Sequence, residues 1–268
     1  MPHIVVNGTD LYYELHGPTG APVLVLLNGI LMGTASWPYQ VPVLSQHYRL
    51  LLHDCRGQWQ SAHPEGPYTM ELHADDLAAL LDALDIQRAH IMGISYGGEI
   101  AMTFALKYPA RVRSLVLSST VSHSEPALRL IIAGWLRAAR LHDPDLFFEV
   151  TATDNFSAAW IAANRPLLEA ARQRYATLDF EAVARLCECF LAYDIRASLG
   201  QIKAPTLVMV GEDDHLKGRD YAEYIASHIP GAELLVIPHA GHAVCWERPG
   251  EFNTLILGFL ARQCESTN

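Results

Sequence analysis

The feature that most constrains the fold is a series of short, unbroken apolar runs that each end at turn residues. The first covers residues 23–27 and stops at Asn28-Gly29. A run of this kind is typical of a β-strand that is buried on both faces, as in a parallel sheet. Further strands are predicted at residues 48–53, 89–92, 114–118, 206–210 and 233–237.

Helical segments separate these predicted strands. They are expected at residues 70–84, 96–108, 219–229 and 252–262. Strands that alternate with helices form βαβ crossovers, which give a mostly parallel central sheet with helices on both faces. Residues 3–16 predict an antiparallel hairpin that turns at Asn7-Gly8. The sequence therefore predicts an α/β fold.

One long segment interrupts the alternation. Residues 125–201 contain only helical stretches, and we expect a helical cap inserted into one discontinuous core domain, residues 1–124 and 202–268. Arginines of this segment are expected to be mainly solvated helix charges, one of which could bind an acidic substrate group; examples are Arg129, Arg137 and Arg165. Its aromatic residues are expected to form the cap core and, in part, an apolar pocket: Trp135, Phe147, Phe148, Phe156, Trp160, Phe180, Phe190 and Tyr193.

Composition excludes several classes of protein. A chain of 268 residues that is 50% hydrophobic can bury a large core of its own. Its net charge of −10 repels phosphate backbones and acidic lipids, so nucleic-acid and membrane partners are not expected. We see no signal peptide and no apolar run long enough to span a bilayer, and we expect a cytoplasmic protein with a small-molecule partner. Whether it forms a homodimer stays open.

The five cysteines suggest neither a disulfide framework nor a metal site. They are Cys55, Cys187, Cys189, Cys245 and Cys264, and no two have the Cys-x-x-Cys spacing. We expect buried, reduced thiols.

A strand-turn-helix unit carries the first chemical signal. The strand at residues 89–92 runs into Gly93-Ile94-Ser95-Tyr96-Gly97, and a helix follows at once. Gly-x-Ser-x-Gly in this context presents a serine hydroxyl at a helix N-terminus, where backbone N–H groups favour a developing oxyanion. Ser95 is therefore the predicted nucleophile.

A serine hydroxyl is a weak nucleophile and needs a base. The predicted strand at residues 233–237 leads to two histidines, His239 and His242, on one short loop. We favour His242, because the preceding Gly241 gives the loop freedom.

The acid that orients this base is expected after the strand at residues 206–210, where Asp213 and Asp214 are neighbours. Adjacent side chains near a strand end tend to point apart, so only one can face His242. We choose Asp214 and keep Asp213 in reserve. In this role the carboxylate would hold the imidazole in its useful tautomer.

Two further motifs follow earlier predicted strands. They are Asn28-Gly29-Ile30-Leu31 and Asp54-Cys55-Arg56-Gly57. Together with the chain order Ser-Asp-His, they make the chain resemble the α/β-hydrolase superfamily over essentially everything outside the cap. The resemblance implies an α/β-hydrolase fold, with an oxyanion hole formed by the backbone N–H groups of Ile30 and Tyr96.

The sequence departs from the family pattern at two positions. Asn28 stands where histidine is usual, and we expect its side chain to hold the loop by hydrogen bonds. Trp59 replaces a glycine and is expected to lie against the cap or simply to pack. Elsewhere, Glu99 is expected to complement the positive helix end, and Cys245 to be a packed thiol.

The favoured function is a serine hydrolase that cleaves a carboxylic ester or lactone through an acyl-enzyme, with no metal or organic cofactor. An alternative on the same residues is an acyltransferase, because Asn28 resembles the residue of rhamnolipid-precursor synthases as well as that of some enol-lactonases. A low-turnover ligand-binding relative is the third hypothesis.

Overall fold

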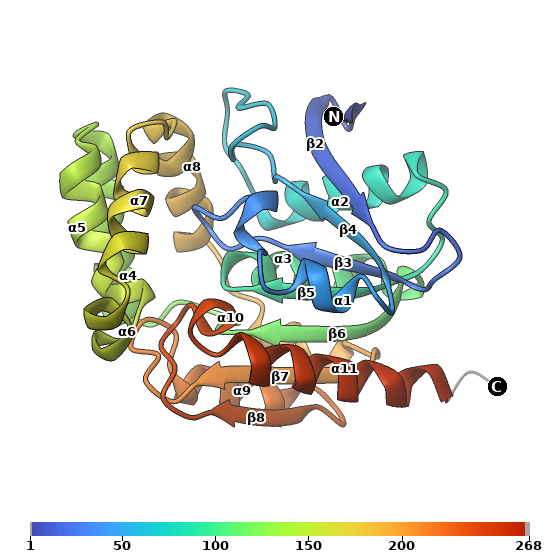
Figure 1. The fold of residues 1–268 in the computed structure, drawn as a ribbon. Helices are drawn as coiled ribbons and strands as arrows, with labels where there is room; N and C mark the ends of the chain where they lie inside the picture. The colour runs from blue at the N-terminus through green and yellow to red at the C-terminus, as the bar shows by residue number, and fades with distance from the viewer. Residues whose placement is uncertain (1, 266–268) are drawn as a thin grey trace.

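The computed structural model describes residues 2–265 and contains one eight-stranded sheet (Figure 1). The strands are β1 (His3–Val6), β2 (Thr9–His16), β3 (Val23–Leu27), β4 (Arg49–His53), β5 (Ala89–Ile94), β6 (Val112–Ser118), β7 (Thr206–Gly211) and β8 (Glu233–Ile237). Their order in the sheet is β1-β2-β4-β3-β5-β6-β7-β8. The pairs β1–β2 and β2–β4 are antiparallel, and the other neighbours are parallel. The predicted mostly parallel sheet is confirmed.

Helices cover both faces of this sheet. They are α1 (Val41–Leu44), α2 (Met70–Ala83), α3 (Tyr96–Lys107), α9 (Arg219–His228), α10 (Val244–Glu247) and α11 (Pro249–Glu265), with 3₁₀ turns at Thr34–Ser36, Pro109–Arg111 and Arg196–Gln201. Successive strand side chains point to opposite faces. In β3, Leu24 and Leu26 therefore lie on the face that α1 and α11 cover, whereas Val25 and Leu27 lie on the opposite face, which α2, α3 and α9 cover.

Five helices lie between β6 and β7 and form the helical insertion. They are α4 (Pro126–Arg140), α5 (Pro144–Asn155), α6 (Ala158–Ala163), α7 (Arg165–Tyr175) and α8 (Phe180–Leu191). Side chains of Asp143, Ser157 and Asp179 accept backbone N–H groups at the starts of α5, α6 and α8. Figure 1 shows the five helices gathered beyond the carboxyl ends of the parallel strands. Those strand ends are where α/β proteins bind ligands.

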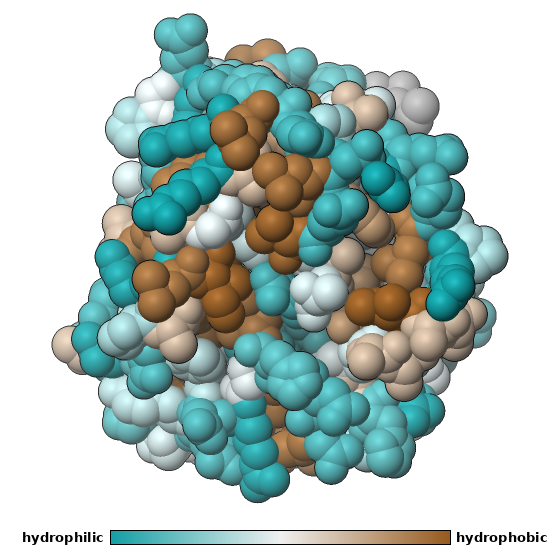
Figure 2. All heavy atoms as spheres, turned by 90° about the vertical axis from the view of Figure 1, so that its left-hand side faces the viewer, coloured by the Kyte–Doolittle hydropathy of each residue, from teal (hydrophilic) through white to brown (hydrophobic). Residues whose placement is uncertain are grey.

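The aromatic residues of the insertion divide into two groups, as the sequence predicts. Five are buried: Trp135, Phe147, Phe180, Phe190 and Tyr193. The other three of the eight that were predicted, Phe148, Phe156 and Trp160, line a cavity, and so does a ninth aromatic residue, Tyr175. Figure 2 looks onto this end of the molecule, where apolar and polar residues are interspersed; Leu130, Leu141 and Leu167 are exposed in this part of the chain.

Most predicted elements lie within a few residues of the observed ones. The final helix begins three residues earlier than predicted, at Pro249, since proline at a first helical position loses no hydrogen bond. The helices α1 and α10 have four residues each, too few to show periodicity, and were not predicted. Within residues 2–265, none of the helices combines the length and apolar character needed to cross a membrane. The side chain of Cys264 lies outside the described part.

Candidate active site

Ser95 occupies the turn between β5 and α3. Its backbone has φ 53° and ψ −120°, a conformation that non-glycine residues rarely adopt. The Ser95 N–H donates to the Ser118 carbonyl at 2.9 Å, which ties the turn to the end of β6. Strained backbone of this kind is common at functional sites. Here it places the hydroxyl in a cavity directly before the N-terminus of α3.

The two glycines that flank Ser95 are required by close backbone contacts. A Cβ atom at Gly93 would lie 2.2 Å from the Gly97 carbonyl oxygen, and one at Gly97 would lie 2.2 Å from the Leu27 carbonyl oxygen. Neither contact can be relieved by a side-chain rotation, because both partners are backbone atoms. The turn can therefore lie against β3 only with glycine at both positions.

His242 and Asp214 form a buried pair on the loops that follow β8 and β7. His242 Nδ1 lies 2.9 Å from Asp214 Oδ2, and both side chains are at most 5% exposed. The other oxygen, Oδ1, accepts the backbone N–H groups of Leu216 and Lys217 at 3.0 and 2.8 Å. Burial would raise the pKa of Asp214, but the charge and hydrogen bond of His242 and the Lys217 N–H hold that pKa below its usual value.

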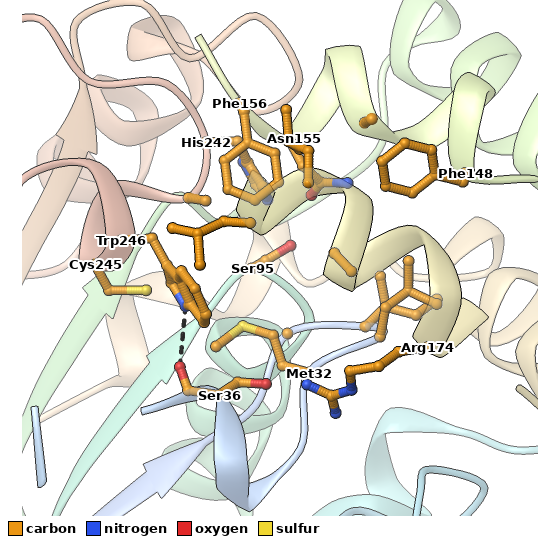
Figure 3. Close-up of a pocket in the computed structure, with 18 of the residues that line it drawn as sticks. Met32, Ser36, Ser95, Phe148, Asn155, Phe156, Arg174, His242, Cys245 and Trp246 are labelled. Carbon is orange, nitrogen blue, oxygen red and sulfur yellow. Dashed lines mark hydrogen bonds between the residues drawn. The ribbon is translucent and has the colours of Figure 1, made fainter. Parts of the chain in front are cut away.

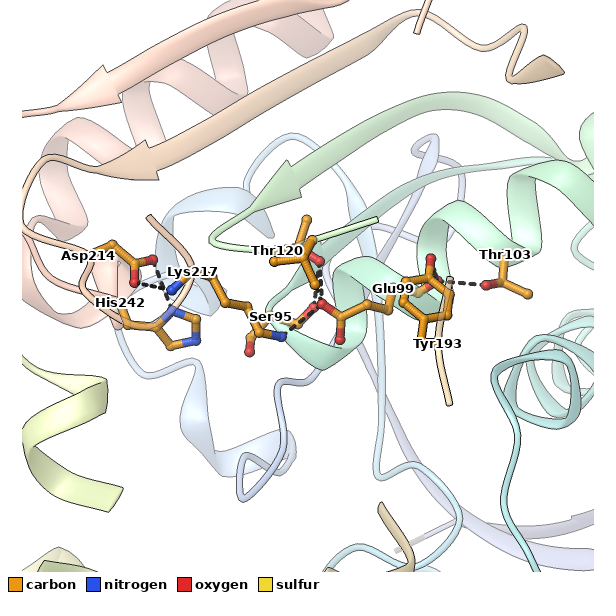
Figure 4. A network of polar contacts seen from close by, with 9 residues as sticks. Ser95, Glu99, Thr103, Thr120, Tyr193, Asp214, Lys217 and His242 are labelled. Carbon is orange, nitrogen blue, oxygen red and sulfur yellow. Dashed lines mark hydrogen bonds and ion pairs between the residues drawn. The ribbon is translucent and has the colours of Figure 1, made fainter. Parts of the chain in front are cut away.

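The structure brings together the three residues that we predicted to act as nucleophile, base and acid. Ser95 and His242 line the same cavity. Figure 4 shows the His242 ring next to the Asp214 carboxylate and on the side toward Ser95. The two residues that we considered as alternatives lie apart from this group. The exposed His239 faces Glu212 across 3.8 Å, and Asp213 is only half-buried.

Two backbone N–H groups beside Ser95 have no partner. Among residues 2–265, the amides of Ile30 and Tyr96 donate to no acceptor. Both residues border a small cavity together with Ser95. Unpaired donors next to a nucleophile are what an oxyanion hole requires.

Asn28 holds the loop that carries Ile30, as the sequence predicts. The fully buried Asn28 side chain donates from Nδ2 to the His53 carbonyl at 2.8 Å and accepts from Trp37 Nε1 at 2.7 Å. The buried Asn28 amide therefore pairs with both the His53 carbonyl, an acceptor, and the Trp37 indole N–H, a donor.

Trp59 supports the same loop from the other side. Its backbone has a positive φ of 47°, and its Nε1 donates to the Leu31 carbonyl at 3.0 Å. The guanidinium of Arg174, from α7, lies 4.5 Å from the centre of its ring. Trp59 thus packs against both the loop and the helical insertion, which were the two expectations for this residue.

A cavity of about 240 Å³ opens above Ser95 and His242 (Figure 3). Its floor comes from the loop after β3 and the turn before α3, and its roof from α5, α6 and α7. Most lining residues are apolar, among them Met32, Phe148, Phe156, Trp160 and Trp246. The cavity therefore suits a substrate with a substantial apolar part.

Two contacts in the site were not predicted. Lys217 Nζ lies 2.8 Å from Glu99 Oε1, so Glu99 pairs with a buried lysine in addition to its place near the start of α3 (Figure 4). Glu247 accepts the N–H and hydroxyl of Ser157 at 2.9 and 2.6 Å, which links α10, the helix directly after the histidine loop, to the insertion. Both contacts join residues distant in sequence, so no local pattern could have indicated them.

The four cysteines whose side chains the structure describes are buried, as predicted. In Cys245, which borders the cavity, burial raises the pKa to about 12, so this cysteine stays protonated at neutral pH. In the described part of the chain, no three His, Cys, Asp or Glu side chains are grouped to hold a metal ion.

Known proteins resemble this chain over nearly its whole length. A protein of Stutzerimonas stutzeri named "Putative carbamate hydrolase RutD" is 35% identical over 95% of this chain and 98% of its own. The enol-lactonase of Burkholderia xenovorans LB400 superposes with a TM-score of 0.91 at 30% identity, over 97% of this chain and 100% of that chain. MGS-M2, an alpha/beta hydrolase enzyme from a deep-sea metagenome, gives a TM-score of 0.93 at 32% identity, over 97% of both chains.

The family described as alpha/beta hydrolase fold matches residues 22–249. The matched region begins just before β3 and ends at the first residue of α11, so it includes all the loops that carry the site. The chain belongs to the alpha/beta hydrolase family.

Proposed function

We propose that this protein is a serine hydrolase that cleaves a carboxylic ester or lactone through an acyl-enzyme. Ser95 Oγ attacks the carbonyl carbon while its proton passes to His242 Nε2. The oxyanion accepts hydrogen bonds from the amides of Ile30 and Tyr96, and Asp214 stabilises the imidazolium. His242 then protonates the departing alkoxide, which leaves the acyl group on Ser95.

Water completes the reaction. It gives a proton to His242 and attacks the acyl carbonyl, and the acid leaves as Ser95 regains its proton. The observation that carries the proposal is the buried His242–Asp214 pair at 2.9 Å, whose histidine lines the same cavity as the strained Ser95. The similarity to an enol-lactonase supports the ester and lactone class.

We further propose that residues 125–201 act as a cap that selects the substrate, over a core of residues 1–124 and 202–268. The supporting observation is that α5, α6 and α7 supply about half of the cavity lining but no member of the proposed triad.

A carbamate is a second candidate substrate, favoured by the names of several relatives that are 29–35% identical. Its carbonyl could be attacked by the same serine. An acyltransferase would differ only in using an alcohol in place of water. A protein that only binds ligands would react once at Ser95 but would not turn over an ester substrate.

Kinetics on a panel of p-nitrophenyl esters, lactones and carbamates tests these proposals. Ser95→Ala should abolish turnover, and Ser227→Ala, an exposed serine on α9, should leave it unchanged. A Ser95→Ala protein with most of the wild-type rate would overturn the assignment. One equivalent of p-nitrophenol without further release would favour the binding relative, and ester products formed on adding alcohols would favour the transferase.

A further inference from the structure

We propose that the cavity binds substrates that carry a carboxylate remote from the scissile carbonyl, and that Arg174 recognises this carboxylate. The inference rests on the proposed function, because it places an acyl carbonyl at Ser95. It adds the chemical class of the acyl group and the residue that selects it.

Arg174 is placed to meet a ligand in the cavity. It lies in the last turn of α7 and is one of the lining residues, together with Ser95 and His242. Figure 3 shows its side chain reaching from the insertion toward the loop that holds Met32. Arg174 therefore contributes a positive charge to an otherwise mostly apolar cavity.

The Arg174 guanidinium lies over the Trp59 ring. Its central carbon is 4.5 Å from the ring centre, and the Trp59 indole is itself anchored to the Leu31 carbonyl. A cation–π contact of this kind uses no N–H group as a hydrogen-bond donor, and among residues 2–263 the guanidinium donates no hydrogen bond to another residue, so its N–H groups are available. Those N–H groups fit a planar carboxylate by two parallel hydrogen bonds.

Among the side chains of residues 2–263, none neutralises this charge at close range. No carboxylate of these residues lies within 4.0 Å of the Arg174 guanidinium. Arg172 on the same helix provides the contrast, because it pairs with Asp145 at 2.7 Å. Arg174 is therefore a cation in the cavity wall with no anion from the protein in contact with it.

Asp54 is the acidic group whose charge interacts with Arg174 at longer range. Its two oxygens are already used, since they accept the backbone N–H groups of Thr34 and Gln60 at 2.7 and 3.1 Å. Asp54 thus holds the backbone at Thr34 and at Gln60 and forms no ion pair with Arg174.

The overall charge strengthens the inference. A chain with a net charge of −10 repels anions at long range, so an acidic substrate needs a local cation at its binding site. The sequence indicated that an arginine of the insertion could serve this purpose, with Arg129, Arg137 and Arg165 as examples. The structure points instead to Arg174, because Arg129 binds the Leu191 carbonyl and the Ser124 hydroxyl and none of the three lines the cavity.

A matched pair of substrates provides the test. The p-nitrophenyl monoester of adipic acid and p-nitrophenyl hexanoate have acyl chains of equal length and differ in the terminal carboxylate. For Arg174→Met, which keeps an apolar stem, we expect kcat/KM on the acidic ester to fall about 10- to 100-fold, mainly through KM. The neutral ester should change by less than about twofold, and Arg174→Lys should restore part of the loss.

Two controls separate this inference from the proposed function. Arg172→Met removes an exposed charge from the same helix and should leave both substrates unaffected. Ser95→Ala should abolish both activities; if it does not, the proposed function fails. Equal losses on both esters in Arg174→Met, or no loss on either, would overturn the role of Arg174 while leaving the proposed function in place.

Binding gives a readout that does not depend on turnover. Adipate should raise the melting temperature of the Ser95→Ala protein but not that of Ser95→Ala/Arg174→Met. Because Arg174 is exposed, the shift should shrink when sodium chloride is raised from about 50 to 500 mM. Equal shifts in the two proteins, or no shift in either, would contradict the proposal.

Discussion

Lys217 Nζ lies 2.8 Å from Glu99 Oε1, and the two side chains are 3% and 0% exposed. The same carboxylate oxygen accepts the Thr120 hydroxyl at 2.7 Å. Burial raises the pKa of Glu99, and the lysine charge opposes that rise. The backbone N–H of Lys217 also donates to Asp214, so this residue connects the acid loop to the helix that follows Ser95. The pair therefore stabilises the positions of two parts of the proposed triad.

Removing the lysine charge should destabilise the fold strongly. Lys217→Met leaves a buried carboxylate without its cation, and we expect the free energy of unfolding in urea to fall by about 3–5 kcal/mol. The double variant Glu99→Gln/Lys217→Met should lose less, because neither charge remains. Arg219→Met breaks the exposed pair with Glu223 and should cost under about 1 kcal/mol. A Lys217→Met protein as stable as this control would contradict the prediction.

A single methyl group at Gly97 should disrupt the nucleophile turn. In Gly97→Ala, the new Cβ would lie 2.2 Å from the Leu27 carbonyl oxygen, so the backbone of α3 or β3 must shift. We expect a loss of stability on the order of 3 kcal/mol, measured by urea unfolding.

Gly134→Ala is the matched control. Gly134 lies inside α4, and a Cβ there would meet none of the described atoms within 4 Å. Alanine should stabilise this helix by about 0.5–1 kcal/mol. If the two variants changed stability in the same direction, the close approach at Gly97 would not explain the glycine.

Two buried histidines should make the fold sensitive to acid. Burial lowers the pKa of His53 to about 4 and that of His73 to about 3. Between pH 6.5 and these values the unfolded chain binds protons that the folded protein does not, so stability falls as the pH falls. For each histidine we expect a loss of roughly 3 kcal/mol between pH 7.5 and 4.5.

Replacing His73 should flatten that dependence. In His73→Gln, urea unfolding at pH 7.5, 5.5 and 4.5 should show a slope smaller by about one proton. His47→Gln, on the surface, should keep the wild-type slope. An unchanged slope in His73→Gln would mean that this histidine is not kept neutral by burial.

Glu247 should control how firmly the insertion is held over His242. In Glu247→Ala, Ser157 loses both acceptors at the start of α6, so the insertion has fewer contacts with α10, the helix that directly follows the histidine loop. We expect faster hydrogen exchange in α6 and in residues 240–243. Glu251→Ala, which removes an exposed carboxylate of α11, should leave that exchange unchanged. Equal exchange in both variants would exclude the contact as a restraint.

The parts of this structure that were predictable are local. The bounds of β8 and the turn at Ser95 follow from sequence patterns that are only a few residues long. The preference for Asp214 over Asp213 as the partner of His242 needed only the opposite directions of neighbouring side chains, and the structure places Asp214 against His242.

The parts that were not predictable depend on the packing of distant segments. Glu99 and Lys217 are separated by 118 residues, and the sheet order brings them together. The cation–π contact between Arg174 and Trp59 depends on how α7 packs on the core, which no periodicity within α7 determines. A charge in a helix and an aromatic residue in a turn have no recognisable relation until both are placed in space.

The strands that flank the helical insertion are direct neighbours. Ser118, the last residue of β6, pairs with Met209 of β7, so the chain leaves the sheet and returns one strand away. The entropy needed to close such an excursion grows only slowly with its length. We therefore expect that replacing the insertion by another segment of similar length would change the closure entropy little and would leave the register of β6 and β7 in place. The replacement would have to restore the contact between Ser157 and Glu247, and also the packing of Trp135 and Phe190, which belong to the same hydrophobic cluster as Val25 of β3.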